Sequence, residues 1–157
     1  MVKLMNRKSF TLLLVEDELA DVALFQDLLA DAVAEVDVIH VENGRQALQY
    51  LNREDQFLNA TYPDLVVLDL NMPVMNGHDF LAHVKQQPEL RSIPVMILST
   101  SDHPDDIQRA YHGYASGYVV KPSTYEEFVR VVKTIEAYWR GLVRLPSIAE
   151  VATRAAR

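Results

Sequence analysis

Short, unbroken apolar runs alternate along the chain with segments in which apolar residues recur at helical spacing. The unbroken runs predict five strands, over residues 10–15, 36–41, 65–68, 95–98 and 118–120. Apolar residues three or four positions apart predict a helix after each strand, over residues 19–33, 44–58, 78–87, 105–112 and 124–142. The chain is therefore predicted to alternate strand and helix along most of its length.

The strand pattern also predicts how these elements pack. Because the strands are apolar throughout, and not only at every second position, we expect helices to cover both faces of the sheet. Right-handed crossovers then give an α/β fold, a parallel doubly wound sheet with five strands and five helices. The length of 157 residues fits one such domain. Ligands of these sheets bind beyond the carboxyl ends of the strands, where the strand order reverses.

Polar residues stand at the ends of four of the five predicted strands. Glu16 and Asp17 follow the first strand, Asp69 the third, Ser99 the fourth and Lys121 the fifth. If the sheet forms, the three carboxylates converge at one edge. Carboxylates this close repel one another, so at least one takes up a proton unless a cation lies among them. Carboxylate and carbonyl oxygens suit Mg²⁺, whose coordination shell a phosphate often completes.

Asp69 then has a chemical reason to follow a buried strand. An aspartate is a competent phosphoryl acceptor when a metal neutralises the incoming charge. Lys121 supplies a positive charge and Ser99 a hydroxyl donor for the oxygens of a phosphoryl group on Asp69. Each motif alone has an ordinary structural explanation: the acids at 16–18 suit a helix N-terminus, and Asp69 suits a turn. Only their joint placement at strand ends favours chemistry.

Four motifs, in this order, resemble the receiver domain of bacterial two-component response regulators: LLLVEDE, LDLNMPVMNG, PVMILSTS and ASGYVVKP. The resemblance covers residues 9–141 and implies a flavodoxin-like fold with strand order 2-1-3-4-5. Residues 142–157 are then a C-terminal tail, with Pro146 as a break, and we expect no output domain.

The resemblance assigns a role to each acid of the site. Asp69 is implied to be the phosphoacceptor, which takes its phosphoryl group from a histidine of a partner sensor kinase. The Mg²⁺ ligands are implied to be Glu16, Asp17, Asp69 and the backbone carbonyl of Asn71. The protein is then a phosphorylated component of a phosphorelay.

The resemblance also implies how the phosphorylated site signals. Ser99 and Lys121 are expected to contact the phosphoryl group, and Ser99 and Tyr118 to form the switch, with Tyr118 turning inward on activation. The Lys121–Pro122 peptide bond is expected to be cis.

Some features depart from minimal receivers. Glu16 replaces the commoner aspartate, Ser99 replaces threonine, and the stretch around residues 55–62 is longer. With the ending IEAYWRGLVRLP, these features resemble the small response regulators that serve cyanobacterial and bacterial phytochromes. The expected kinase is therefore a phytochrome, although the sequence does not identify the input, the downstream target or the phosphoryl lifetime.

The predicted final helix is apolar over more of its circumference than one contact requires. A surface helix needs an apolar arc of only about 100°, and three residues widen the arc here: Val131, Tyr138 and Leu142. With Tyr111 and Tyr114 nearby, we expect a homodimer through the fourth helix, fifth strand and fifth helix. The alternative is that residues 143–157 fold back over this surface.

Composition narrows the classes of partner. The chain has 22 acidic residues against 15 basic ones and no basic cluster, which argues against a nucleic-acid partner. It has no cysteine and no export signal, which suits the cytoplasm. Because no run of about 18 apolar residues occurs, we expect no membrane segment.

Other functions remain as alternatives. Haloacid-dehalogenase-type phosphatases also use a strand-end aspartate, but they need a second one two positions later as general acid. Asn71 occupies that position, so we expect a signalling protein and not an enzyme. A nucleotide-binding domain would need a glycine-rich loop where residues 16–19 lie. A receiver that binds partners without phosphorylation is not supported, since no site residue is missing.

Overall fold

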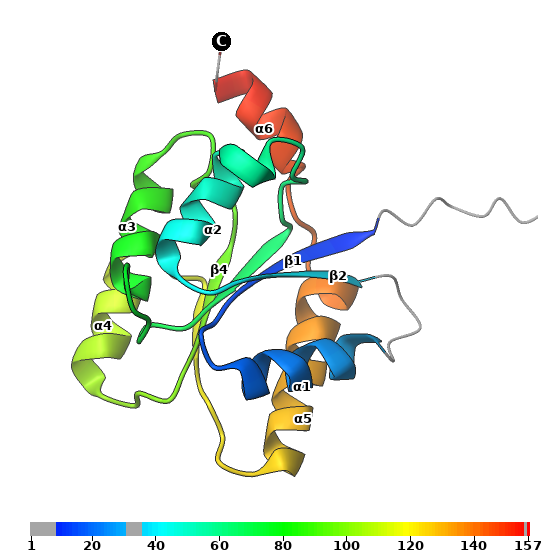
Figure 1. The fold of residues 1–157 in the computed structure, drawn as a ribbon, viewed down its shortest axis with the longest axis vertical. Helices are drawn as coiled ribbons and strands as arrows, with labels where there is room; N and C mark the ends of the chain where they lie inside the picture. Colours follow the sequence, from blue (N-terminus) through cyan, green and yellow to red (C-terminus); the bar gives the residue numbers. More distant parts are fainter. Residues whose placement is uncertain (1–8, 31–35, 156) are drawn as a thin grey trace, which may run out of the picture.

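The computed structural model describes residues 9–30, 36–155 and 157, which form a sheet with helices on both faces (Figure 1). The sheet is parallel and its strand order is β2-β1-β3-β4-β5. The fold class and the strand order are therefore as predicted. The strands are β1 (Phe10–Val15), β2 (Val36–Val41), β3 (Leu65–Leu68), β4 (Val95–Ser99) and β5 (Gly117–Val120).

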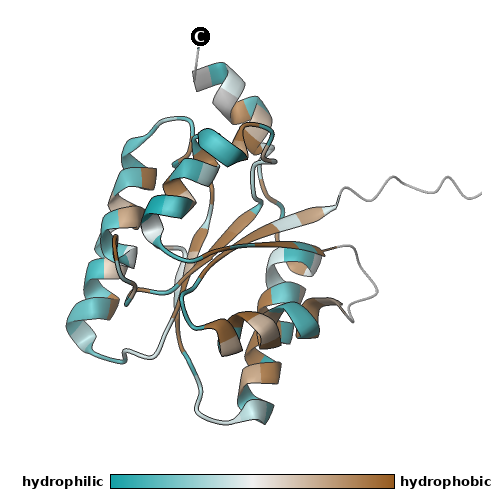
Figure 2. Cartoon of the chain, in the orientation of Figure 1, coloured by the Kyte–Doolittle hydropathy of each residue, from teal (hydrophilic) through white to brown (hydrophobic). Residues whose placement is uncertain are grey.

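Helices cover both faces of the sheet, and each face buries its own apolar core. Alternate residues of β1 explain why the strand is apolar throughout: Leu13 and Val15 contribute to one core, and Leu12 and Leu14 to the other. Figure 2 shows the central strands as mostly hydrophobic, while the surrounding helices carry hydrophilic stretches. On one face lie α1 (Leu19–Ala30) and α5 (Tyr125–Glu136), and on the other α2 (Gly44–Leu51), α3 (Gly77–Gln86) and α4 (Pro104–His112).

The structure differs from the predicted elements in two helices. The helix predicted over residues 44–58 ends at Leu51, and Arg53 and Asp55 have left-handed φ values of 55° and 51°, which an α-helix does not accept. A short 3₁₀ turn, η1 (Asp55–Phe57), follows. The final helix widens into a π-helical segment, η2 (Ala137–Leu142). The end of the helix predicted over 19–33 lies outside the described residues.

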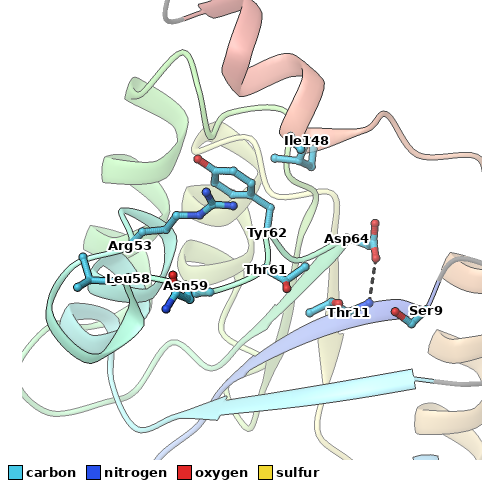
Figure 3. A pocket seen from close by; sticks show the side chains of 11 residues that line it. Ser9, Thr11, Arg53, Leu58, Asn59, Thr61, Tyr62, Asp64 and Ile148 are labelled. Atoms are coloured by element: carbon cyan, nitrogen blue, oxygen red, sulfur yellow. Dashed lines mark hydrogen bonds between the residues drawn. The ribbon is translucent and has the colours of Figure 1, made fainter.

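A sixth helix, α6 (Ile148–Ala155), was not predicted and lies in the tail. Ile148 is only 4% exposed and belongs to the same core as α2 and α3, with Tyr62 packed against that core. Figure 3 shows Ile148 beside the pocket of about 410 Å³ formed with the inserted loop, where the Arg53 guanidinium lies 4.2 Å from the centre of the Tyr62 ring. The described part of the tail therefore packs on the inserted loop (around residues 55–62), and Tyr138 and Leu142 of the final helix remain exposed.

None of the helices in the described ranges is long and apolar enough to cross a membrane.

Candidate functional site

Asp69 lies directly after β3, at the carboxyl edge of the sheet. Its amide donates to the carbonyl of Val15 at 3.0 Å, which ties the end of β3 to the end of β1. The chain then turns tightly into α3, because the amide of Gly77 donates to the carbonyl of Leu70 at 2.9 Å. A Cβ atom at Gly77 would lie 2.4 Å from the carbonyl oxygen of Asp69, so only glycine fits there. Asp69 itself is 7% exposed.

The structure brings together the three carboxylates that the sequence predicts to converge. One oxygen each of Glu16, Asp17 and Asp69 lies within 4.8 Å of the others, a spacing at which they could hold a metal ion. Glu16 and Asp69 are buried, while Asp17 is exposed and leaves the cluster open to solvent. Asn71 is exposed beside them, with its amide 3.4 Å from Oδ1 of Asp69.

Lys121 is the cation of the cluster. Its Nζ lies 2.5 Å from Oε2 of Glu16, 3.0 Å from Oδ2 of Asp21 and 3.6 Å from Oδ2 of Asp69. Its backbone amide donates to the carbonyl of Ser99 at 2.7 Å, so the β4–β5 ladder continues into the site. Burial alone would lower the pKa of the Lys121 ammonium, but the hydrogen bond to Glu16 and the charges of Asp69 and Glu16 outweigh burial and raise that pKa.

The pKa of the Glu16 carboxyl is raised above its ordinary value. Burial raises the pKa of Glu16 to about 7, with the charge of Asp69 adding to the rise and the hydrogen bonds from Lys121 and Glu18 opposing it. Near neutral pH, Glu16 therefore holds a proton for part of the time unless a second cation, besides the Lys121 ammonium, stabilises its ionised form. The repulsion between carboxylates that the sequence predicts therefore contributes to the raised pKa, but burial contributes most.

Ser99 ends β4 and is fully buried, and its hydroxyl accepts the amide of Ser101 at 3.3 Å. Tyr118, on β5, is partly buried and donates its hydroxyl to the carbonyl of Ser101 at 2.7 Å. The ring is therefore already turned toward the loop between β4 and α4. This hydrogen bond links the predicted switch residue to the segment that begins at Ser99.

Two sets of contacts were missed from the sequence. Asp21, in the first turn of α1, reaches Lys121, and its only sequence signal is a position four residues after Asp17. In the second set, Asp106 of α4 accepts the Ser101 hydroxyl at 2.5 Å and lies 3.4 Å from Nε2 of His78. The hydrogen bond from Ser101 is the main reason that the pKa of Asp106 is lowered.

The prediction of a cis Lys121–Pro122 bond is wrong, because no peptide bond within the described ranges is cis. The trans form of an X–Pro bond is favoured by about 0.5–1 kcal/mol. With this bond trans, the Lys121 amide donates to the carbonyl of Ser99 and its ammonium lies among the acids.

This fold and this arrangement of residues match a known protein family. The family model described as "Response regulator receiver domain" matches residues 12–133. The chain belongs to the response regulator receiver family. As a receiver domain, it acts in phosphorylation-based two-component signalling.

The relatives of this receiver domain are similar over most of their length. Response regulator Rcp1 of Synechocystis sp. is 35% identical over 136 residues, which are 87% of this chain and 92% of Rcp1. The probable methanogenesis regulatory protein FilR2 of Methanothrix harundinacea is 36% identical over 140 residues, or 89% of this chain and 90% of FilR2.

Solved structures match the receiver domain equally well. The phosphorylated cyanobacterial phytochrome response regulator RcpA is 38% identical with a TM-score of 0.87, over 89% of this chain and all of the RcpA chain. The Mn²⁺-bound form of Rcp1 is 34% identical with a TM-score of 0.84, over 87% of this chain and 99% of that chain. The receiver is thus homologous to phytochrome response regulators.

Proposed function

We propose that Asp69 is the phosphoacceptor of this receiver and that its phosphorylation depends on Mg²⁺. The observation that carries the proposal is the convergence of Glu16, Asp17 and Asp69 within 4.8 Å of one another, with the Lys121 ammonium 3.6 Å from Asp69. A buried aspartate with neighbouring carboxylates that could hold a metal ion, and with an ammonium beside it, has the groups that phosphoryl transfer needs.

Mg²⁺ would be held by the carboxylates of Glu16, Asp17 and Asp69 and by the carbonyl of Asn71. The donors fit, because they are hard oxygen ligands and the three carboxylates lie within 4.8 Å of one another. Rcp1 has been solved with Mn²⁺, a divalent ion that also accepts carboxylate ligands. When bound, the ion supplies positive charge against the incoming phosphoryl oxygens.

The residues of the chain carry the transfer itself. An oxygen of Asp69 attacks phosphorus and forms the new O–P bond, while the bond from phosphorus to the kinase histidine nitrogen breaks. The electron pair of that bond stays on the imidazole nitrogen, and the ring leaves as neutral imidazole because its other nitrogen already carries a proton. Lys121 then neutralises charge on the phosphoryl oxygens, and the Ser99 hydroxyl donates to one of them. This use of Asp69 is a single phosphorylation and not the turnover of an enzyme.

The switch would act through Ser99 and Tyr118. A phosphoryl group on Asp69 attracts the Ser99 hydroxyl, and movement of Ser99 shifts Ser101, whose carbonyl holds the Tyr118 hydroxyl. The loop between β4 and α4 therefore couples the site to the surface of α4, β5 and α5.

We also propose a homodimer through this α4–β5–α5 surface. β5 is an edge strand. Between β5 and α5 runs a groove of about 440 Å³, and the indole N–H of Trp139 in its wall lies 3.2 Å from the sulfur of Met96. Large apolar side chains remain exposed on the same surface: Tyr111, Tyr114, Val120, Tyr138 and Leu142.

The dimer is tested by sedimentation from about 1 to 50 μM. We expect the wild type to associate and Leu142→Glu to remain monomeric. Leu58→Glu is the matched control, because Leu58 is 69% exposed against 73% for Leu142 but lies in the inserted loop. A wild type that stays monomeric throughout would remove the dimer.

The kinase partner that we propose is a phytochrome, and we place both proteins in the cytoplasm without a nucleic-acid partner. The support is the similarity to RcpA and Rcp1. Phosphotransfer from a purified cyanobacterial phytochrome kinase should be faster than from an unrelated histidine kinase. Equal rates would contradict the proposed phytochrome partner. The similarity to FilR2, whose name does not mention a phytochrome, would agree with that result.

Intact-protein mass after incubation with acetyl phosphate tests the phosphoacceptor. We expect one added phosphoryl group in the wild type, only with Mg²⁺, and none in Asp69→Asn. Asp79→Asn is the control, since Asp79 is an exposed acid at the start of α3, outside the cluster. An adduct of equal yield in Asp69→Asn would assign the phosphoryl group to another residue.

A further inference from the structure

The Lys121 ammonium lies closer to Asp21 than to the proposed phosphoacceptor. The ammonium lies 3.0 Å from Oδ2 of Asp21 but 3.6 Å from Oδ2 of Asp69, the group whose phosphoryl oxygens it would contact. The first distance is a hydrogen bond and the second is too long for one. Lys121 is therefore held nearer to α1 than to the phosphoacceptor.

Asp21 is suited to hold this ammonium. Its position in the first turn of α1 is one where the helix dipole favours an acid. Its side chain is 33% exposed, whereas the Lys121 side chain is only 7% exposed, so the buried cation depends on partners at the protein surface as well as inside. Of the acids around Lys121, Asp21 is the one that does not belong to the three-carboxylate cluster.

The partners of Lys121 change if the cluster binds a cation. Glu16, its nearest partner at 2.5 Å, would turn its charge toward the metal, and Asp69 would do the same. A buried ammonium without a hydrogen-bonded partner is costly. Asp21 is then the carboxylate that continues to pair with Lys121 until phosphoryl oxygens arrive.

We propose that Asp21 is a positioning residue that holds Lys121 beside α1 in the unphosphorylated protein and gives it up to the phosphoryl oxygens on Asp69. This inference rests on the proposed function. It adds a competitor to the site: the Lys121–Asp21 pair stabilises the unphosphorylated arrangement, so its loss favours binding of a phosphoryl group.

Beryllofluoride, a mimic of the phosphoryl group, tests the competition. In saturating Mg²⁺, we expect Asp21→Asn to bind beryllofluoride about twofold to fivefold more tightly than the wild type in calorimetry, the effect of a partly exposed ion pair. Asp21→Glu should restore an affinity close to that of the wild type, because it restores the acid.

Glu18→Gln is the matched control. Glu18 is an exposed acid at the same end of α1, and its carboxylate accepts the amide of Ala20 at 3.4 Å. The variant removes the same charge from the same helix terminus, so a general electrostatic effect would appear equally in both. An equal gain in Glu18→Gln, or unchanged or weaker binding in Asp21→Asn, would overturn the proposal.

Chemical reactivity of Lys121 separates this inference from the proposed function. With neither Mg²⁺ nor a phosphodonor present, acetylation of Lys121 by an amine reagent, followed by peptide mass spectrometry, should be about twofold faster in Asp21→Asn and unchanged in Glu18→Gln. Unchanged reactivity in Asp21→Asn means that Asp21 does not hold the ammonium. If the wild type failed to bind beryllofluoride, the phosphoacceptor proposal would fail, while this measurement would still decide the contact.

Discussion

The carboxyl and amino edges of the sheet differ in character. At the carboxyl edge, three carboxylates from the ends of β1 and β3 lie within 4.8 Å of one another, and the ammonium of Lys121, which follows β5, lies 2.5 Å from Glu16. At the opposite edge, the inserted loop and α6 enclose a pocket of about 410 Å³ in which Arg53 stacks on Tyr62 and Asp64 accepts the amide of Thr11 at 2.9 Å. The pocket is roomy, but its charged groups are already paired with the protein itself. The proposed site therefore lies where carboxylates converge, and not at this pocket.

This contrast makes a prediction for each end: changes at the carboxyl edge should alter phosphorylation, and changes at the pocket should alter stability. The largest effect is expected for Lys121→Met. Removing a preorganised charge from a transition state typically costs a factor of about 100 to 1,000, so phosphorylation by acetyl phosphate should slow by at least about 100-fold in a mass-spectrometric time course.

Lys85→Met is the control for this variant. Lys85 is half-buried, and its ammonium donates to the carbonyls of Arg91 and Ile93, away from the acids. The Lys85→Met variant should have a lower free energy of unfolding, but its phosphorylation rate should stay within about twofold of the wild-type rate. If the Lys121→Met rate lay within a factor of about three of the wild-type rate, the proposal that the Lys121 charge assists phosphorylation would be wrong.

At the pocket, Ile148→Ala should lower the free energy of unfolding by about 2–3 kcal/mol. Ile148 is 4% exposed, and truncating a buried isoleucine removes its contacts and leaves a cavity. Urea denaturation measures the loss, and the phosphorylation rate should not change. Val151→Ala, at a half-buried position of the same helix, should cost under about 1 kcal/mol. Equal losses would show that α6 is not anchored through Ile148.

The carboxyl edge should also respond to pH. The pKa of Glu16 is about 7 in the folded protein against an ordinary value of 4.5, so the folded state retains a proton that the unfolded chain has lost between those values. Stability without metal should therefore fall as pH rises from about 5 to 7. Thermal unfolding in a chelator should show this slope, which should disappear in Glu16→Gln and in saturating Mg²⁺. A slope that persists in Glu16→Gln would have another origin.

The smallest effect is expected at Arg53, whose guanidinium lies 4.2 Å from the centre of the Tyr62 ring. Arg53→Ala should lower the free energy of unfolding by about 0.5–1 kcal/mol, the value of an exposed cation–π contact, while phosphorylation stays unchanged. Arg53→Lys retains a cation and should lose less. A loss in phosphorylation rate in either variant would mean that the two ends are coupled.

The same contrast explains what could be predicted from the sequence. The strands and the convergence at the carboxyl edge were predictable, because apolar runs define parallel strands and strand ends meet at one edge. Asp21 was missed because its contact with Lys121 joins residues 100 positions apart through a helix whose rotation is set by packing.

The opposite edge was less predictable for physical reasons. Arg53 and Asp55 end α2 through left-handed backbone conformations that non-glycine residues seldom adopt, so no residue type marked the stop. The docking of Ile148 depends on a loop shape that only the folded chain has. The cis Lys121–Pro122 bond was implied by the resemblance alone, and the structure has the trans form that X–Pro bonds ordinarily prefer.

Trp139 gives the molecule a built-in optical reporter. It is the only tryptophan of the chain, it is partly buried, and its indole N–H faces the sulfur of Met96 in the wall of the groove between β5 and α5. Any occupant of that groove would displace water from the indole and shift its emission to shorter wavelength. Unlabelled protein can therefore be followed by fluorescence as it associates, in real time and in the same cuvette in which it is phosphorylated.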